Sequence, residues 1–409
     1  MNLKIVGLIV EYNPFHNGHL HHIEESLRIT GADTAIVVMS GNFVQRGAPA
    51  LMPKHLRTEI ALHAGVSLVL ELPVRYATGS AEYFAQGAVS TLHALGCVDS
   101  ICFGSECGNI EQLTTIADIL VQEPPRYQEA LQEQLRSGKS YPVARQLAMA
   151  YYLEQLQYDT PLVSILADPN NILGIEYIKA LRRIGSSMVP RTIPRVVSHY
   201  HDTHLQETYS SASAIRSKLQ QDLTNWELLS QQMPLDSHQQ LTALLEKRFP
   251  VYTNDFSLLL HNQLLRETKE TLLTYADMTE ELANRILKNR NSFLTFEQFC
   301  ACIHTKNLTY ARVSRVLLHI LLNIHSTEVT VPYLHVLGFR RTASSLLTII
   351  KAKGTAPLVT KLTTVTDISP EGQQLLAEDL YAANLYEAVI THKFQTNFIH
   401  EYEQSILLV

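Results

Sequence analysis

The sequence has no apolar run that could cross a membrane. Spanning a bilayer takes about 20 consecutive apolar residues, and no stretch of the 409 residues approaches that length. The first four residues, MNLK, lead directly into a short apolar run and lack the cleavage pattern of a secretory signal peptide. These two absences predict a cytoplasmic protein that does not act at a membrane.

Cysteine is also scarce. The five cysteines are an odd number without the spacing of a disulfide framework, which fits reduced thiols in a cytoplasm. Cys300 and Cys302 lie too close together for a structural bridge, and the other three are predicted to pack in or near the core. The sequence contains neither an internal repeat nor a low-complexity segment, and its 46% hydrophobic and 18% charged content is typical of a soluble globular protein.

A net charge of −6 argues against a nucleic-acid partner, but the charge is unevenly distributed. Residues 281–353 hold ten lysines and arginines and three glutamates, a net charge of +7, so the rest of the chain carries −13. A basic region on an otherwise acidic protein is the expected footprint of a polyanion-binding surface. A solvated helical face that happens to be basic would give the same count.

Strand-like and helix-like runs alternate through the first 220 residues. Strands are predicted at 5–10, 35–39, 67–72, 100–104 and within 188–197, and helices from about 19 and at 55–64, 81–95, 170–181 and 211–219. This order predicts an α/β fold, a Rossmann-like parallel sheet whose ligand lies beyond the carboxyl ends of the strands. Residues 110–159 are predicted to be a helical insertion. Leucine-rich helical runs dominate beyond residue 220, which predicts domains 1–220 and 221–409, the second mainly α-helical.

The most informative segment is His16-Asn17-Gly18-His19, in the turn between the first strand and a helix. Backbone N–H groups are exposed at such a turn, and the helix dipole favours an anion there. Gly18 allows the main chain to approach a ligand closely. The placement therefore predicts a phosphate site rather than a merely packed histidine pair. No cysteine or carboxylate pair joins these histidines at metal-ligand spacing, so no metal site is predicted.

Residues 211–216, SASAIR, form a second candidate phosphate-binding segment. A serine-rich turn that opens a helix offers amides and hydroxyls to the β- and γ-phosphates, and Arg216 adds a positive charge. An ordinary capped helix can have the same residues. This segment therefore supports a phosphate site only in combination with the histidine pair. Arg46 and Lys54 are further cationic candidates.

The histidine pair resembles the signature of the HIGH superfamily of nucleotidylyltransferases, whose two histidines contact ATP phosphates. The longer string EYNPFHNGH, residues 11–19, resembles the bacterial tRNA(Met) cytidine acetate ligase family. The resemblance implies the HIGH nucleotidylyltransferase type of α/β fold. It continues at SGNFVQRG (40–47), ELP (71–73), FGSE (103–106), NNILGIEY (170–177), YHD (200–202), SSASAIR (210–216) and VLGFR (336–340).

The resemblance implies a two-step reaction. Acetate attacks ATP to give acetyl-adenylate and pyrophosphate, with Mg²⁺ bridging the phosphates. The exocyclic amine of the wobble cytidine in elongator tRNA(Met) then attacks the acetyl carbon, so N4-acetylcytidine forms and AMP leaves. ATP, acetate and elongator tRNA(Met) are the implied partners, and no tightly bound prosthetic group is implied.

The resemblance also implies roles for individual residues. Those implied in catalysis are His16, His19 and Arg216. Those implied in ATP binding are Gly7, Leu8, Ile9, Val10, Glu11, Tyr12, Asn13, Pro14, Phe15, His16, Asn17, Gly18, His19, Leu20, Gly104, Asn170, Arg195 and Val196. Asn170 is chosen over the adjacent Asn171, although the pattern alone leaves both open. Neither a general base nor an acetate-binding residue is evident from the sequence.

Basic side chains beyond residue 280 are the candidates for gripping the tRNA backbone while an unstacked anticodon base is presented to the site. The candidates are Arg312, Arg315, Arg340, Arg341 and Lys351. Arg312 and Arg315 fall on the polar face of an amphipathic helix, so simple solvation of that helix is the alternative interpretation.

Two other functions use the same motifs. A small-molecule adenylyl- or cytidylyltransferase would need the same histidine pair, and the fold does not separate it from a ligase. It would have no need of the basic segment, however. A non-catalytic RNA-binding protein with a degenerate nucleotide site is the second alternative. The intact histidine pair and the intact serine-rich segment argue against it.

Overall fold

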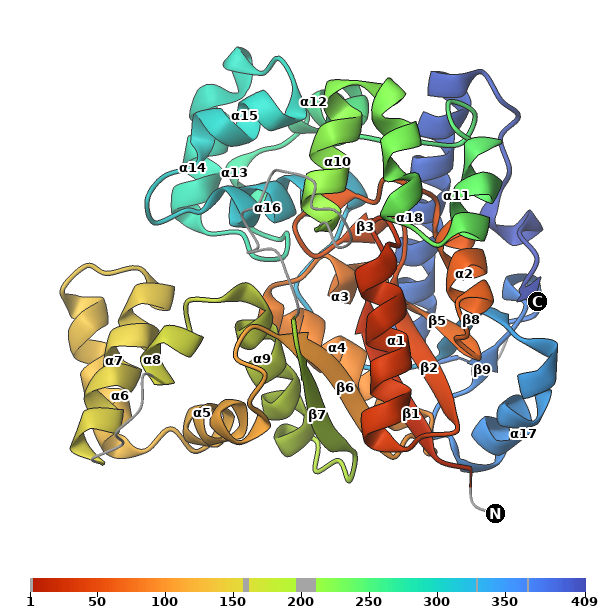
Figure 1. Cartoon of the computed structure of the whole chain (residues 1–409). Helices are drawn as coiled ribbons and strands as arrows, with labels where there is room; N and C mark the ends of the chain where they lie inside the picture. Colours follow the sequence, from red (N-terminus) through yellow and green to blue (C-terminus); the bar gives the residue numbers. More distant parts are fainter. Residues whose placement is uncertain (1–2, 157–161, 196–210, 329, 366–367) are drawn as a thin grey trace.

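The computed structural model describes residues 3–156, 162–195, 211–328, 330–365 and 368–409. Five parallel strands in the order β5-β2-β1-β6-β7 form the centre of its main sheet, which confirms the predicted Rossmann-like arrangement (Figure 1). Their bounds are β1 (Ile5–Val10), β2 (Thr34–Ser40), β5 (Leu68–Leu72), β6 (Ser100–Ser105) and β7 (Val189–Pro194). The strand order reverses between β1 and β6, so a crevice is expected at their carboxyl ends.

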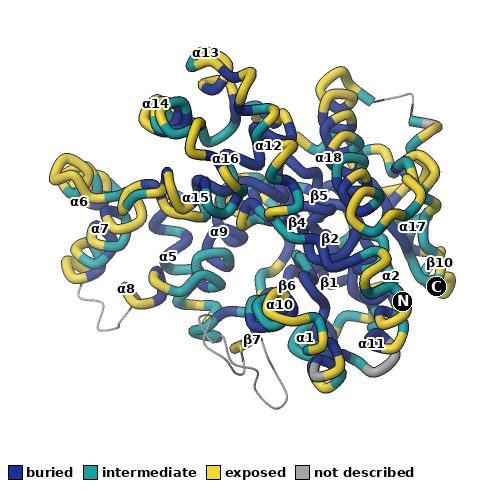
Figure 2. Tube along the Cα trace, turned by 90° about the horizontal axis from the view of Figure 1, so that it is seen from above, coloured by how far each residue is buried: buried dark blue, intermediate teal, exposed yellow. Residues whose placement is uncertain are grey.

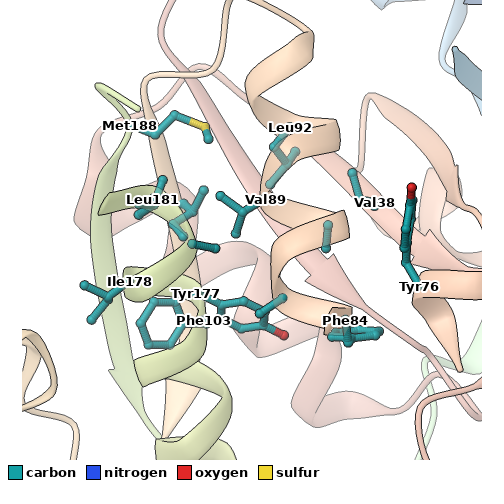
Figure 3. Close-up of a cluster of buried hydrophobic side chains, with 14 of the residues drawn as sticks. Val38, Tyr76, Phe84, Val89, Leu92, Phe103, Tyr177, Ile178, Leu181 and Met188 are labelled. Atoms are coloured by element: carbon teal, nitrogen blue, oxygen red, sulfur yellow. The ribbon is translucent and has the colours of Figure 1, made fainter. Parts of the chain in front are cut away.

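Helices cover both faces of this sheet, because successive side chains of each strand point to opposite sides. On β2, Ala35, Val37 and Met39 pack with α1 (Asn17–Thr30) and α2 (Lys54–His63). Ile36 and Val38 point to the other face and join a cluster with residues of α4 (Ala81–Ala94) and α9 (Pro169–Arg183), part of which Figure 3 shows. Burial on both faces accounts for the continuous apolar runs in the sequence.

The predicted helical insertion is present and extends away from the sheet (Figure 1). Much of its surface is exposed, as the yellow segments of α6 and α7 show in Figure 2. Its helices are α5 (Ile110–Gln122), α6 (Pro125–Arg136), α7 (Tyr141–Gln155) and α8 (Leu162–Ile165).

Residues beyond 220 are largely helical, as predicted, but they also extend the sheet. Strand β8 (Leu334–Phe339) pairs antiparallel with β5, and both β10 (Leu407–Leu408) and β9 (Leu358–Val359) pair with β8. The sheet and its core therefore run across the predicted boundary at residue 220, and a division of labour between the two halves stays a prediction. The main helices here are α10 (Ala212–Gln221), α11 (Leu235–Thr242), α12 (Ser257–Leu264), α14 (Glu280–Asn289), α15 (Phe296–Ile303), α16 (Tyr310–Leu322), α17 (Ser344–Lys353) and α18 (Pro370–Phe394).

A buried charge network joins the two halves. Lys54, 1% exposed, lies with its Nζ 2.7 Å from Oε2 of Glu71 and 2.8 Å from Oε1 of Glu401. Nδ1 of His335, on β8, lies 2.8 Å from Oε2 of Glu71. The two carboxylates raise the pKa of Lys54 against the opposing effect of its burial. Lys54 is therefore a structural cation that fastens the C-terminal segment to β5, and it does not line the cleft described below.

Replacing Lys54 with methionine is expected to lower the free energy of unfolding by about 3–5 kcal/mol, because two buried carboxylates lose their cation. Lys393→Met is the matched control. The Lys393 side chain pairs with Asp255 at 2.7 Å but is 28% exposed, so its loss should cost less than about 1 kcal/mol. Urea unfolding of both variants tests this expectation, and equal losses would contradict it.

Candidate active site

The turn between β1 and α1 holds the two signature histidines in one hydrogen-bonded unit. His16 is the N-cap of α1, and its Nδ1 accepts a hydrogen bond from the Gly18 N–H at 3.1 Å. Nδ1 of His19 accepts from the His16 N–H at 3.3 Å, and the two rings stack with centroids 3.8 Å apart. Because both Nδ1 atoms accept, each neutral ring carries its proton on Nε2. The unit thus offers two Nε2–H donors beside the first turn of a helix.

Both rings are neutral at physiological pH. Burial, together with the positive charges of Arg195 and Arg216, lowers the pKa of His16 to about 3. Burial also lowers the pKa of His19 well below its ordinary value, with His16 as the next cause. Neutral imidazoles stabilise an anion as hydrogen-bond donors.

The second predicted segment supports this turn from α10. Ser211 is the N-cap of α10 and accepts from the Ala214 N–H at 3.1 Å. Arg216, one turn further, donates from Nη1 to the carbonyl oxygen of Asn13 at 2.5 Å. The structure therefore brings the two signature segments together, and Arg216 fixes the backbone that presents His16.

The two histidines line a cavity of about 520 Å³, a volume typical of a small-molecule site. It lies at the carboxyl ends of β1 and β6, where the strand order reverses, as the Rossmann-like arrangement predicts. Gly104 at the end of β6, Asn170 at the start of α9 and Arg195 after β7 also line it. Val196 lies outside the described residues.

The Asn170 side of the cavity is held by Glu106. Its carboxylate accepts from Nδ2 of Asn170 at 2.6 Å and from the backbone N–H of Asn171 at 2.8 Å. Arg195 donates to Oδ1 of Asn170 at 3.1 Å. Asn171 is 1% exposed and accepts from the Cys107 N–H. Of the two adjacent asparagines, it is thus Asn170 that faces the cavity.

A sequence model of the HIGH Nucleotidyl Transferase family matches residues 3–401. The chain belongs to this family. It is 40% identical over 421 residues to the tRNA(Met) cytidine acetate ligase of Acetivibrio thermocellus, with 100% of both chains covered. It is 37% identical over 402 residues to the protein of the same name from Alkaliphilus metalliredigens, with 95% of both covered.

Solved structures are similar over the same extent. The apo form of Thermotoga maritima TmcAL matches this HIGH nucleotidyltransferase with a TM-score of 0.94 and 32% identity, covering 99% of each chain. The same protein bound with alpha-thio ATP matches with a TM-score of 0.91, again at 32% identity and 99% coverage of each chain. The fold assigned above is therefore that of a characterised nucleotide-binding structure.

In this HIGH nucleotidyltransferase, the cavity carries more positive than negative charge. The cavity is lined by three arginines, Arg46, Arg195 and Arg315. Among the described residues, Glu11 is the one carboxylate side chain in its lining. Arg315 arrives from α16, far along the chain, and its Nε lies 3.5 Å from Oδ2 of Asp277. A guanidinium excess of this kind suits a polyanion such as a triphosphate.

The five basic residues predicted to grip tRNA do not form one surface. Arg312 and Arg315 lie on α16, and Arg315 lines the cavity that contains the histidine pair. Arg340 donates its N–H to the carbonyl of Ser67, which directly precedes β5. Because they follow β8 directly, Arg340 and Arg341 lie toward the amino-terminal edge of the parallel strands, opposite the cavity. Lys351 lies on α17, at the same edge of the sheet (Figure 1). The tRNA role of each residue stays a prediction.

This HIGH nucleotidyltransferase was also searched for a metal site and for membrane-spanning helices. Among the described residues, no group of three histidine, cysteine, aspartate or glutamate side chains is placed to hold a metal ion. None of the described helices is both long and apolar enough to span a bilayer. Ala81 and Phe84 of α4 also line the cavity, and they belong to none of the sequence motifs.

The depressed histidine pKa values should make stability depend on pH. Burial lowers the pKa of His22 to about 4, and that of His16 to about 3. Groups with such values contribute stability above the unfolded pKa of about 6.5, and this stability is lost as pH falls. We expect each histidine to cost about 1.4 kcal/mol per pH unit below that point.

The difference in unfolding free energy between the wild type and His16→Asn isolates this contribution, measured by thermal or urea unfolding from pH 7 to pH 5. Titrating groups that do not interact with His16 cancel in that difference, including Asp379, whose pKa is raised to about 7 by burial and by Glu71. A difference that stays constant over this range would contradict the assignment of a depressed pKa to His16.

Proposed function

We propose that this chain is an ATP-dependent tRNA(Met) cytidine acetate ligase that works in the cytoplasm. The observation that carries the proposal is the cavity at the end of β1, where two neutral histidines and a helix N-terminus meet a cluster of arginines. Relatives that share the chain's full length bear the name of this activity. A related protein of the same fold binds an ATP analogue.

In the first step, a carboxylate oxygen of acetate attacks the α-phosphorus of ATP. The bond from that phosphorus to the bridging oxygen breaks, so pyrophosphate leaves and acetyl-adenylate forms. The Nε2–H groups of His16 and His19 donate to phosphate oxygens, and Arg195 and Arg315 offset the charge that develops. Arg216 holds the turn through the Asn13 carbonyl. Positioning and electrostatic stabilisation therefore account for this step.

In the second step, the exocyclic nitrogen of the wobble cytidine attacks the acetyl carbonyl carbon. The carbonyl carbon–oxygen bond to the phosphate breaks, AMP leaves, and the amine proton passes to solvent. Elongator tRNA(Met) presents this base unstacked, as single-stranded anticodon bases allow. Arg312 lies on the same helix as Arg315, and in this proposal α16 guides the anticodon toward the cavity.

Mg²⁺ fits this site as a companion of the triphosphate. Magnesium bound with nucleotides keeps several waters and needs only one or two protein carboxylates. Glu11, which lines the cavity and accepts from the Gln45 N–H at 2.8 Å, would be that carboxylate. The ion would neutralise phosphate charge, while the histidines and arginines orient the reacting groups.

The test is ATP–pyrophosphate exchange with and without acetate, followed by addition of elongator tRNA(Met) and mass spectrometry of its nucleosides. Acetate-dependent exchange and appearance of N4-acetylcytidine are expected. Exchange that ignores acetate would instead favour a small-molecule nucleotidylyltransferase. ATP binding without any exchange would favour a non-catalytic RNA-binding protein.

A further inference from the structure

Arg57 of α2 is fully buried, and its side chain bonds to backbone carbonyl oxygens. Its Nη1 donates to the carbonyl of Glu11 at 2.6 Å and to that of Ser40 at 3.0 Å. Its Nη2 donates to the carbonyl of Gly41, and its Nε donates to that of Met52 at 3.1 Å. One guanidinium thus joins the carboxyl ends of β1 and β2 to the residues that precede α2.

Arg75 is a second buried arginine, and its surroundings differ from those of Arg57. It lies on α3 (Val74–Ala77), is 6% exposed, and donates from Nε to Oε2 of Glu378 at 2.9 Å. This ion pair fastens α3 to α18 and compensates the charge of the guanidinium. The hydrogen-bond partners of Arg57 among the described residues are carbonyl dipoles and not a carboxylate. Burial lowers the pKa of Arg57 to about 10, so it remains charged at neutral pH.

The segment that Arg57 holds is the turn that leads from β1 to the histidine pair. In this turn Tyr12 has a φ of +49°, a left-handed conformation that is unfavourable for a residue with a Cβ. Such a conformation persists only where the surrounding structure fixes it. The carbonyl before Tyr12, that of Glu11, accepts from Arg57. The carbonyl of Asn13, the residue after Tyr12, accepts from Arg216. Two guanidiniums from distant parts of the chain therefore hold the turn on both sides of its strained residue.

The position of this turn sets the geometry of the site. Glu11 at its start and His16 at its end both line the cavity, and His16 also caps α1. The Leu51 N–H donates to Oδ1 of Asn13 at 2.8 Å, which ties the middle of the turn to the residues that precede α2. A shift of the turn would therefore move the carboxylate of Glu11 and the ring of His16 relative to a bound nucleotide.

We propose that Arg57 is a positioning residue of the active site, which together with Arg216 holds the β1–α1 turn so that His16 meets the triphosphate in the productive geometry. Arg57 does not line the cavity, so it acts through the turn and not by contact with ATP. This inference rests on the proposed ligase function and deepens it, because it adds a residue of the nucleotide step that does not touch the nucleotide.

The first experiment measures acetate-dependent ATP–pyrophosphate exchange by the full chain, at a temperature where near-ultraviolet circular dichroism shows each variant to be folded. Arg57→Met should lower kcat/KM for ATP by about 10²-fold, the cost of misplacing a catalytic group by about 1 Å. Arg57→Lys should lie between this variant and the wild type, because an ammonium keeps the charge but lacks the planar fork that reaches several carbonyls.

Arg75→Met is the matched control for this experiment. It also removes a buried arginine and leaves Glu378 without its cation, so its thermal stability should fall. Its kcat/KM per folded molecule should nevertheless equal that of the wild type. An equal loss of exchange in Arg57→Met and Arg75→Met would overturn the positioning role, and so would full exchange in a folded Arg57→Met.

A double-mutant cycle tests whether the two arginines act through one turn. After Arg57→Lys has loosened the turn, Arg216→Lys has less left to disturb, so the loss in the double variant should be smaller than the product of the single losses. Arg195→Lys is the comparison, because Arg195 donates to Asn170 and not to the turn, and its loss should multiply with that of Arg57→Lys. Multiplying losses for Arg57→Lys and Arg216→Lys would overturn the shared role, and this cycle decides even where Arg57→Met does not fold.

The affinity for ATP separates this inference from the proposed function. In calorimetric titration with ATP, the Kd of Arg57→Met should be about tenfold higher than that of the wild type, since a displaced turn gives up a hydrogen bond to a charged phosphate. The Kd of Arg75→Met should not change. A wild type that binds ATP without acetate-dependent exchange would refute the ligase function alone, and the Kd of Arg57→Met would still decide its role. An unchanged Kd and unchanged exchange in folded Arg57 variants would refute the positioning role alone.

Discussion

Replacing His16 with asparagine is expected to lower the rate of ATP–pyrophosphate exchange by about 10²- to 10³-fold, the usual cost of removing one preorganised donor to a developing anion. Asparagine is among the best N-cap residues, so it can take over the bond from Gly18 that His16 makes at the start of α1. Its short side chain cannot place a donor where Nε2 of His16 lies. The substitution therefore separates catalysis from helix capping.

His63→Asn is the matched control for this prediction, because His63 is exposed in the last turn of α2 and does not line the cavity. Its exchange rate should equal that of the wild type. His19→Ala should resemble His16→Asn in rate, since the two rings form one stacked unit. A variant of His16 that folds with unchanged thermal stability and retains full exchange would show that the stacked pair is only structural.

Strands β1, β2, β5 and β6 were predictable because each is a short, largely apolar run bounded by residues that break it. Strand β7 is more polar, and the sequence predicts it only within 188–197. Strand β5 is predicted at 67–72 and observed at Leu68–Leu72, with Pro73 directly after it. Strand β8 has a similar apolar content, but its place in the sheet depends on pairing with β5, which lies far earlier in the chain. Local periodicity carries no information about such a partner, so the extension of the sheet across residue 220 was not foreseen.

The candidate site likewise contains residues that local motifs predict and residues that only tertiary packing places there. The histidine turn and the serine-rich segment are local motifs, and the structure brings them together through Arg216 and Asn13. The adjacent residues Asn170 and Asn171 look alike in the sequence, and only their burial separates them. The charge of Arg315 predicts a role in binding the tRNA backbone. Its place in the cavity follows from the packing of α16 on Gly47, which no spacing along the chain could reveal.

Arg315→Glu should impair both steps of the reaction, whereas Arg312→Glu should impair only the second. A carboxylate at position 315 would stand beside the triphosphate, and reversing a charge at such a distance costs several kcal/mol at an effective dielectric of about 20. We expect exchange to fall by about a hundredfold. Arg312 does not line the cavity, so exchange should persist in Arg312→Glu while tRNA acetylation falls.

The salt dependence of tRNA binding provides the second readout. Losing one phosphate contact lowers the slope of log affinity against log salt by about one, and we expect at least this change in Arg312→Glu. Arg340→Glu is the comparison at the opposite edge of the sheet, near Ser67. Because the wobble base must enter the cavity, Arg340→Glu should lose less tRNA affinity than Arg312→Glu. The reverse order would mean that the tRNA body is held by the far edge of the sheet, and α16 would then serve the nucleotide alone.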